Sequence, residues 1–186
     1  MKNFSVQAVL FGLFFANSVF AHNVQLNAPL PSAKVIKDGE LMIEDKEIIY
    51  KPWSSAQLRG KVRVVHHLAG RSSVKEKNQP LMAAIKAAGF NRNHYQTTTI
   101  INADDAVIAT GLFVKNSAED GKRQNPHSQV ILDQSSQVKK AWQLKAKESF
   151  IAVLDKQGKV QFVAEGKLSA DQTKQVIELV KQLLNN

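Results

Sequence analysis

The order of strand-like and helix-like segments is the feature that most constrains the fold of this chain. The run 61–68 is rich in β-branched residues and predicts a central strand. A helix is expected next, with Ser73 as its N-cap, Glu76 at the reciprocal capping position and Gly89 as its stop. The run 95–101 predicts the following strand. This strand–helix–strand order favours a parallel pair of neighbouring strands.

The remaining segments extend this unit into a larger sheet. Pro80 lies inside the predicted helix and is expected to kink it. The segment 22–55 should be irregular apart from short strands over 41–43 and 48–50. Further along the chain, we expect a helix within 107–122, strands over 130–132 and 138–144, and a hairpin over 150–154 and 160–163. Ser169 and Gln172 should cap a last helix. The fold class is therefore α/β, with a mixed central sheet and helices on both faces.

Three short stretches resemble thioredoxin-like proteins of the longer, peroxiredoxin type. The stretch 58–62 resembles the lead into their first central strand, and Pro80 resembles the proline of their active-site helix. The stretch 153–160 resembles their Asp-x-x-Gly-Lys-Val hairpin. Taken in this order, they imply a single thioredoxin-like domain.

A second resemblance covers nearly the whole chain. The stretches 50–58, 67–78 and 95–100 are similar to the YtfJ family of exported, periplasmic thioredoxin-like proteins of unassigned function. This resemblance implies a periplasmic location and supports the fold. It offers no catalytic residue that can be carried over to this chain.

The chain departs from its redox relatives at the site that defines them. It contains no cysteine, whereas those families place a reactive cysteine near the positions of Ser72 and Lys75 here. Their cis-proline before the third central strand corresponds to Glu148-Ser149-Phe150. Thiol–disulfide chemistry is excluded because it requires a thiolate. We also expect no cofactor.

The first 21 residues have the three parts of a cleavable signal peptide. Lys2 supplies the charge, the run 4–15 is mostly apolar, and cleavage after Ala21 would leave His22 first. A membrane anchor is the alternative, but a span needs about 20 predominantly apolar residues and this run is shorter. We therefore expect an exported domain over 22–186, with no membrane span.

The chain is basic, with a formal net charge of +9. Such a charge suits anionic partners, and peripheral contact with an anionic envelope surface is one expectation. Nucleic acid is disfavoured by the expected compartment. The densest basic stretch comprises Lys139, Lys140, Lys145 and Lys147, and a solvated face is the alternative interpretation of these charges.

The candidate ligand site lies where the first central strand meets its helix. Arg71, Ser72 and Ser73, together with His66 on the strand, could hold an anionic or peptide ligand, because free N–H groups at such a turn favour anions. In the alternative interpretation, Ser73 only caps the helix and Arg71 faces water.

No metal site is predicted. His66 and His67 should point to opposite faces of their strand, so they are unsuited to bind one ion. A freed His22 could bind Cu(II) if His94 or His127 came near it, but chain termini are usually mobile.

Three functions remain open from the sequence. The first is a non-redox binding or accessory module. The second is a thiol-independent enzyme, metal-assisted or hydrolytic. A hydrolytic triad drawn from Ser72 or Ser73, His66 or His67, and Asp104 or Asp105 has no Gly-x-Ser-x-Gly motif behind it. The third is a structural partner in an envelope complex.

Overall fold

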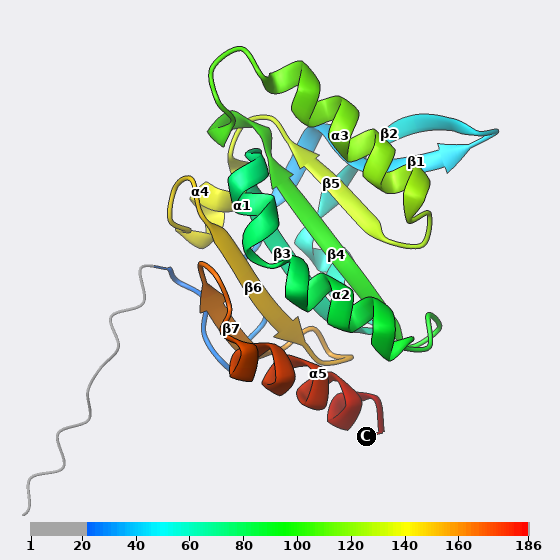
Figure 1. Ribbon diagram of the computed structural model, residues 1–186, viewed down its shortest axis with the longest axis vertical. Coiled ribbons are helices and arrows are strands. Elements are labelled where there is room, and N and C mark those ends of the chain that lie inside the picture. The colour runs from blue at the N-terminus through cyan, green and yellow to red at the C-terminus, as the bar shows by residue number, and fades with distance from the viewer. Residues whose placement is uncertain (1–21, 186) are drawn as a thin grey trace, which may run out of the picture.

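The computed structural model describes residues 22–185, so the predicted signal peptide lies outside the described residues. Seven strands form one sheet in the order β2-β1-β5-β4-β3-β6-β7 (Figure 1). The strands are β1 (Lys34–Glu44), β2 (Glu47–Ser54), β3 (Val62–Ala69), β4 (Tyr95–Asn102), β5 (Gln129–Asp133), β6 (Ser149–Leu154) and β7 (Val160–Glu165). The sheet is mixed as predicted, because β3, β4 and β5 run parallel while the other neighbours are antiparallel.

Within residues 22–185, five α-helices and two short 3-10 helices accompany the strands. They are η1 (Ser55–Leu58), α1 (Ser72–Lys77), α2 (Gln79–Ala88), η2 (Ala103–Asp105), α3 (Gly111–Gln124), α4 (Gln137–Trp142) and α5 (Ala170–Asn185). Among the described residues, no helix combines the length and the apolar character that crossing a membrane requires.

The two faces of the sheet are covered differently. Helices α1, α2, α3 and α5 lie on one face, toward the viewer in Figure 1. The opposite face packs on α4 and on the segment 22–33, around Trp53, Trp142 and Phe150, which are all fully buried. Burying such large aromatic side chains supplies much of the hydrophobic stabilisation of a domain without disulfides.

The helix predicted from Ser73 to the stop at Gly89 is broken into two. Asn78 separates α1 from α2, and Pro80 lies in the first turn of α2, where its missing N–H costs no hydrogen bond. The predicted capping box is wrong, because Arg71 is the N-cap and its carbonyl accepts the N–H groups of Val74 and Lys75.

The strand predicted over 138–144 is also wrong. These residues form α4, which buries Val138 and Trp142, four positions apart on one helical face. The Asp133 carboxylate accepts the N–H of Val138 at 2.8 Å and so stabilises the start of this helix. Periodicity over six residues is too short to separate such a helix from a strand.

Other sequence predictions are confirmed. Ser169 and Gln172 form a reciprocal capping box at α5, with N–H to side-chain oxygen distances of 2.9 and 3.1 Å. The hairpin of β6 and β7 and the hairpin of β1 and β2 are present, although β1 and β2 extend well beyond the predicted strands. Gly89 ends α2 in the left-handed conformation.

Candidate functional site: a groove over the central strand

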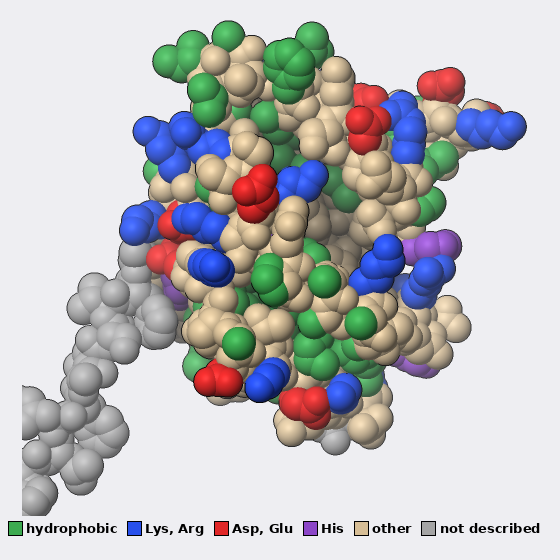
Figure 2. Space-filling view, viewed as in Figure 1, with side chains coloured by type: hydrophobic (Ala, Val, Ile, Leu, Met, Phe, Trp, Pro, Cys, Tyr) green, Lys and Arg blue, Asp and Glu red, His purple; other side chains and the backbone are tan. Residues whose placement is uncertain are grey.

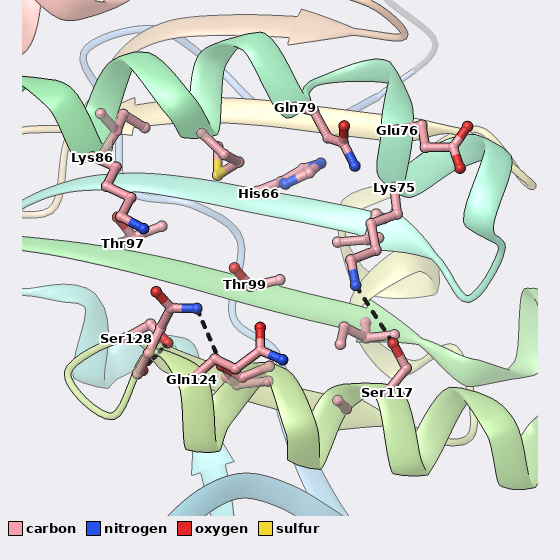
Figure 3. A pocket seen from close by; sticks show the side chains of 18 of the residues that line it. His66, Lys75, Glu76, Gln79, Lys86, Thr97, Thr99, Ser117, Gln124 and Ser128 are labelled. Atoms are coloured by element: carbon pink, nitrogen blue, oxygen red, sulfur yellow. Dashed lines mark hydrogen bonds between the residues drawn. The ribbon is translucent and has the colours of Figure 1, made fainter.

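A groove of about 1340 Å³ runs along β4, between α1 and α2 on one side and α3 on the other. Figure 2 views the molecule onto this face, and Figure 3 shows the lining side chains. Thr97 and Thr99 of β4 form part of the floor, beside His66 of β3. In the middle of the wall that α3 contributes, Ser117, Ala118 and Gly121 have small side chains, which leave the groove wide at this point.

A chain of hydrogen bonds fixes His66 from behind. The Leu168 N–H donates to Asn78 Oδ1 at 2.9 Å, which identifies the other amide atom of Asn78 as the donor. Asn78 Nδ2 then donates to Ser149 Oγ at 2.8 Å and to the Gly166 carbonyl at 2.9 Å. The Ser149 hydroxyl therefore has its proton free to donate to His66 Nε2, which lies 3.0 Å away.

This chain determines the protonation of the His66 ring. Burial lowers the pKa of His66 to about 4, so the ring is neutral near pH 7. The hydrogen bond from Asn78 to the hydroxyl assigns the role of acceptor to Nε2, and on this assignment the single ring proton lies on Nδ1. Among the described residues Nδ1 has no hydrogen-bond partner, and His66 borders the groove. The structure thus presents a fixed, uncharged N–H donor for a groove ligand.

The charge of the groove is strongly one-sided. Four cationic side chains and a single acidic one, Glu76, are among the described residues that line it. The cations are Arg71, Lys75, Lys86 and Arg92. Lys75 reaches across the groove from α1 to Ser117 Oγ on α3, 3.5 Å away (Figure 3). A groove with this charge attracts anionic groups.

The four residues predicted as a ligand site all line this groove, but they differ in whether their side chains already form hydrogen bonds within the protein. Arg71 donates from Nε to the Asp105 carbonyl at 2.6 Å and from Nη2 to the Ala106 carbonyl at 3.4 Å. It therefore holds the loop after β4 as well as bordering the groove. Ser72 and Ser73 are exposed in the first turn of α1.

Two ion pairs lie close to the start of β6 and the end of β4. Lys77 and Glu148 pair at 2.5 Å, joining α1 to the loop before β6. Although burial acts to raise the pKa of Glu148, the Lys77 hydrogen bond and the Ser149 N–H hold it below its ordinary value. Asp105 and Lys139 pair nearby at 2.7 Å, and both side chains are mostly buried.

His67 lies on the face of the sheet opposite to His66, as expected for adjacent residues of one strand. It is fully buried, and its Nε2 has no hydrogen-bond partner among the described residues. Burial, together with the nearby His66, lowers its pKa to about 3.

The fold does not assemble the hydrolytic triad considered from the sequence. The Asp105 carboxylate pairs with Lys139, and the His66 ring contacts the Ser149 hydroxyl, not that of Ser72 or Ser73.

The copper arrangement considered for His22 is not assembled within the described residues. The His22 ring packs edge-on against Phe150, with ring centroids 5.4 Å apart. Phe150 pairs with His67 near the carboxyl end of β3. His94 and His127 are exposed and precede β4 and β5, at the opposite end of the sheet.

A family model described as "Bacterial protein of unknown function (YtfJ_HI0045)" matches residues 24–183. The chain belongs to this family. A YtfJ-family relative from Haemophilus influenzae, described as an uncharacterized protein, is 56% identical over 178 residues, which cover 96% of this chain and 97% of the relative. The uncharacterized protein YtfJ of Escherichia coli K12 is 44% identical over 164 residues, covering 88% and 89% of the two chains.

Solved structures show that this YtfJ-family chain has a thioredoxin-like fold. A protein from Bacteroides thetaiotaomicron, provisionally assigned as a protein disulfide isomerase, matches with a TM-score of 0.61 at 15% identity, over 89% of this chain and 93% of that one. The thioredoxin domain of a thiol-disulfide oxidoreductase from Bacteroides vulgatus matches with a TM-score of 0.54 at 17% identity, over 87% and 99%. Identities this low show the fold alone.

The sequence pattern does not reveal the residues that fix His66. It places Ser149 at the position of the cis-proline of thioredoxin-like proteins and Asn78 inside a continuous helix. One signal for this contact is present in the sequence: Ser149 directly precedes the predicted strand 150–154, and His66 lies in the predicted central strand that packs beside it. The threonines of β4 were recognised as strand formers, and their place on the groove floor follows from the period of two along a strand.

Proposed function

We propose that this YtfJ-family protein is a periplasmic, non-redox binding module that holds an elongated anionic ligand in the groove over β4. The observation that carries the proposal is the His66 donor, fixed by Ser149 and Asn78 within a groove lined by four cations. Charge-assisted hydrogen bonds from lysine and arginine are the contacts that such a ligand would use.

The shape of the groove supports an elongated ligand over a single small ion. Its volume of about 1340 Å³ exceeds that of a typical small-molecule pocket, about 300–1000 Å³. The lining cations are spread from Arg71 beside the carboxyl end of β3 to Arg92, which precedes β4. A chain of anionic groups, such as a polyphosphate or an acidic peptide, would contact several of them at once.

The absence of cysteine removes the activity usual for the thioredoxin-like fold, and the periplasmic location rests on the predicted signal peptide. N-terminal sequencing of protein recovered from the periplasmic fraction tests the location. A first residue of His22 supports it, and a chain that keeps residues 1–21 in the cytoplasm contradicts it.

The groove is tested with tripolyphosphate and with a glutamate-rich peptide as probes, by calorimetry and thermal shift. The decisive variant is Gly121→Leu, because a Cβ at Gly121 meets no atom within 4 Å and a larger side chain would fill the groove. We expect at least one probe to bind, and Gly121→Leu and Lys86→Glu to weaken it at least about tenfold. Lys181→Glu, on the exposed end of α5, is the matched charge control.

Either of two results would overturn the proposed function. One is that neither probe, nor any compound of an envelope extract, binds in a way that depends on the groove. The other is equal binding by the wild type and by Gly121→Leu, which would place the ligand elsewhere.

A further inference from the structure

Four large apolar side chains are exposed close together at the end of the molecule where β4 leads into α3. They are Val107, Ile108, Leu112 and Phe113, here called the apolar crest, and they are 52, 95, 70 and 72% exposed. In Figure 2 apolar side chains gather along the top of the view, over this loop and the start of α3. A cluster of this kind is unusual on a domain surface and marks an interaction site.

Cationic side chains lie beside the crest. The Arg71 guanidinium contacts the carbonyls of Asp105 and Ala106, directly before the crest begins. Lys75 reaches Ser117, one turn after Phe113. Lys139 lies by the same loop and pairs with its buried acid, Asp105, while Asp104 and Glu76 are exposed acids nearby.

We propose that the apolar crest inserts into an anionic membrane surface while the adjacent cations contact the lipid headgroups. Apolar side chains at the tip with lysine and arginine behind them are the arrangement of interfacial membrane binding. The anchors that dominate binding between proteins are enriched in tryptophan, tyrosine and arginine, and none of the four crest residues is of these types. The side chains of the crest are aliphatic or phenyl and form no hydrogen bonds.

This surface adjoins the proposed groove and shares Arg71, Lys75, Val107 and Phe113 with its lining, whereas Ile108 and Leu112 lie outside it. Membrane binding through Ile108 and Leu112 does not require a ligand in the groove. A failure of either proposal therefore leaves the other standing.

The test is flotation with vesicles of phosphatidylcholine alone or mixed with phosphatidylglycerol, using the full chain as the host produces it. We expect binding to the mixed vesicles that weakens with added salt, because the attraction is screened. Ile108→Asp should weaken binding at least about tenfold, since a charge replaces the most exposed apolar side chain. Lys75→Gln should weaken it about fivefold, the effect of one cation at an anionic surface.

Ile36→Asp is the matched control, because Ile36 is 62% exposed on β1 and outside the segment 107–113 that carries the crest. It should bind as the wild type does. No binding to the mixed vesicles, or equal losses in Ile108→Asp and Ile36→Asp, would overturn the proposal. So would a dimer that Ile108→Asp converts to monomer without any vesicle binding, because the crest would then pair two copies of the chain.

Discussion

The hydroxyl of Ser149 lies 3.0 Å from Nε2 of His66, although the two residues are 83 positions apart. They meet because β6 runs antiparallel beside β3. Since the Asn78 amide already donates to this hydroxyl, its proton is directed at the ring. This network assigns the ring proton of His66, which borders the groove, to Nδ1.

The first prediction concerns this tautomer. Nitrogen NMR of the His66 ring should show a protonated Nδ1 and an unprotonated Nε2 at pH 7. Ser149→Ala should lower the free energy of unfolding by about 1–3 kcal/mol, because Asn78 Nδ2 and His66 Nε2 each lose a buried partner.

Ser117→Ala is the control for that change, since Ser117 is an exposed hydroxyl on the groove wall. Its effect on the free energy of unfolding should stay within about 0.5 kcal/mol. A proton found on Nε2 in the wild type would contradict the hydrogen-bond assignment.

The second prediction is a loss of stability in mild acid. Burial lowers the pKa of His66 to about 4 and that of His67 to about 3, from 6.5 in the unfolded chain. Below pH 6.5 the two histidine rings therefore bind protons in the unfolded chain but not in the folded protein, so folding becomes less favourable. From pH 7 to pH 5 the free energy of unfolding should fall by about 2 kcal/mol per histidine.

Urea unfolding at pH 7, 6 and 5 measures this loss. The pKa values of Asp105 and Glu148 are lowered from 3.8 and 4.5, so the stability that these two carboxylates contribute is lost mainly below pH 5. A free energy of unfolding that stays constant from pH 7 to pH 5 would show that the two rings are not buried as described.

The third prediction contrasts two glycines. Gly121→Ala should raise the free energy of unfolding by roughly 0.5–1 kcal/mol, because the new Cβ meets nothing within 4 Å and alanine favours the helix. Gly39→Ala should be strongly destabilising. Gly39 has φ +78°, and a Cβ there would clash with the Lys51 carbonyl oxygen.

Thermal or urea unfolding of the two variants gives the comparison. Equal effects of the two substitutions would mean that β1 and β2 do not approach each other as closely at Gly39 as the structure has them.

The fourth prediction compares two ion pairs of different burial. Lys139→Met leaves Asp105 mostly buried without its cation, and this should cost about 3 kcal/mol of unfolding free energy. Lys181→Met breaks the exposed pair with Glu178 and should cost less than about 0.5 kcal/mol.

The same pair predicts a titration effect. The pKa of Asp105 is lowered because hydrogen bonds from Lys139 and the Lys147 N–H outweigh the effect of burial. It should therefore rise in Lys139→Met, as carbon NMR of the carboxyl group can show. An unchanged pKa would mean that the Lys147 N–H alone sets it.

The sequence predicts the central parts of this fold well where a pattern is long or carries a specific cap. The strands β3 and β4, the terminal hairpin and the capped α5 follow from β-branched runs, turn residues and the Ser169 and Gln172 pair. It fails at α4, where six residues carry too few turns to reveal a helical period. It also fails at Asn78, whose role depends on partners far away in the chain.

The ligand site remains a prediction, and the structure shows where its candidate residues lie. The turn after β3 indicated Arg71, Ser72 and Ser73, and the structure puts all three on the groove with His66. The width of the groove was not predictable, because it depends on how far α3 lies from α2. Nor could any local pattern reveal that Arg71 would be engaged by the Asp105 and Ala106 carbonyls.

The position of Asn78 sets the order in which the groove can be completed during synthesis. Its side chain is held by Ser149, Gly166 and Leu168, which leave the ribosome about 70 to 90 residues later. A chain that ends before Ser149 lacks the hydroxyl that orients the His66 ring. The ligand site therefore matures only when almost the entire polypeptide is available, and shortened chains should lack it.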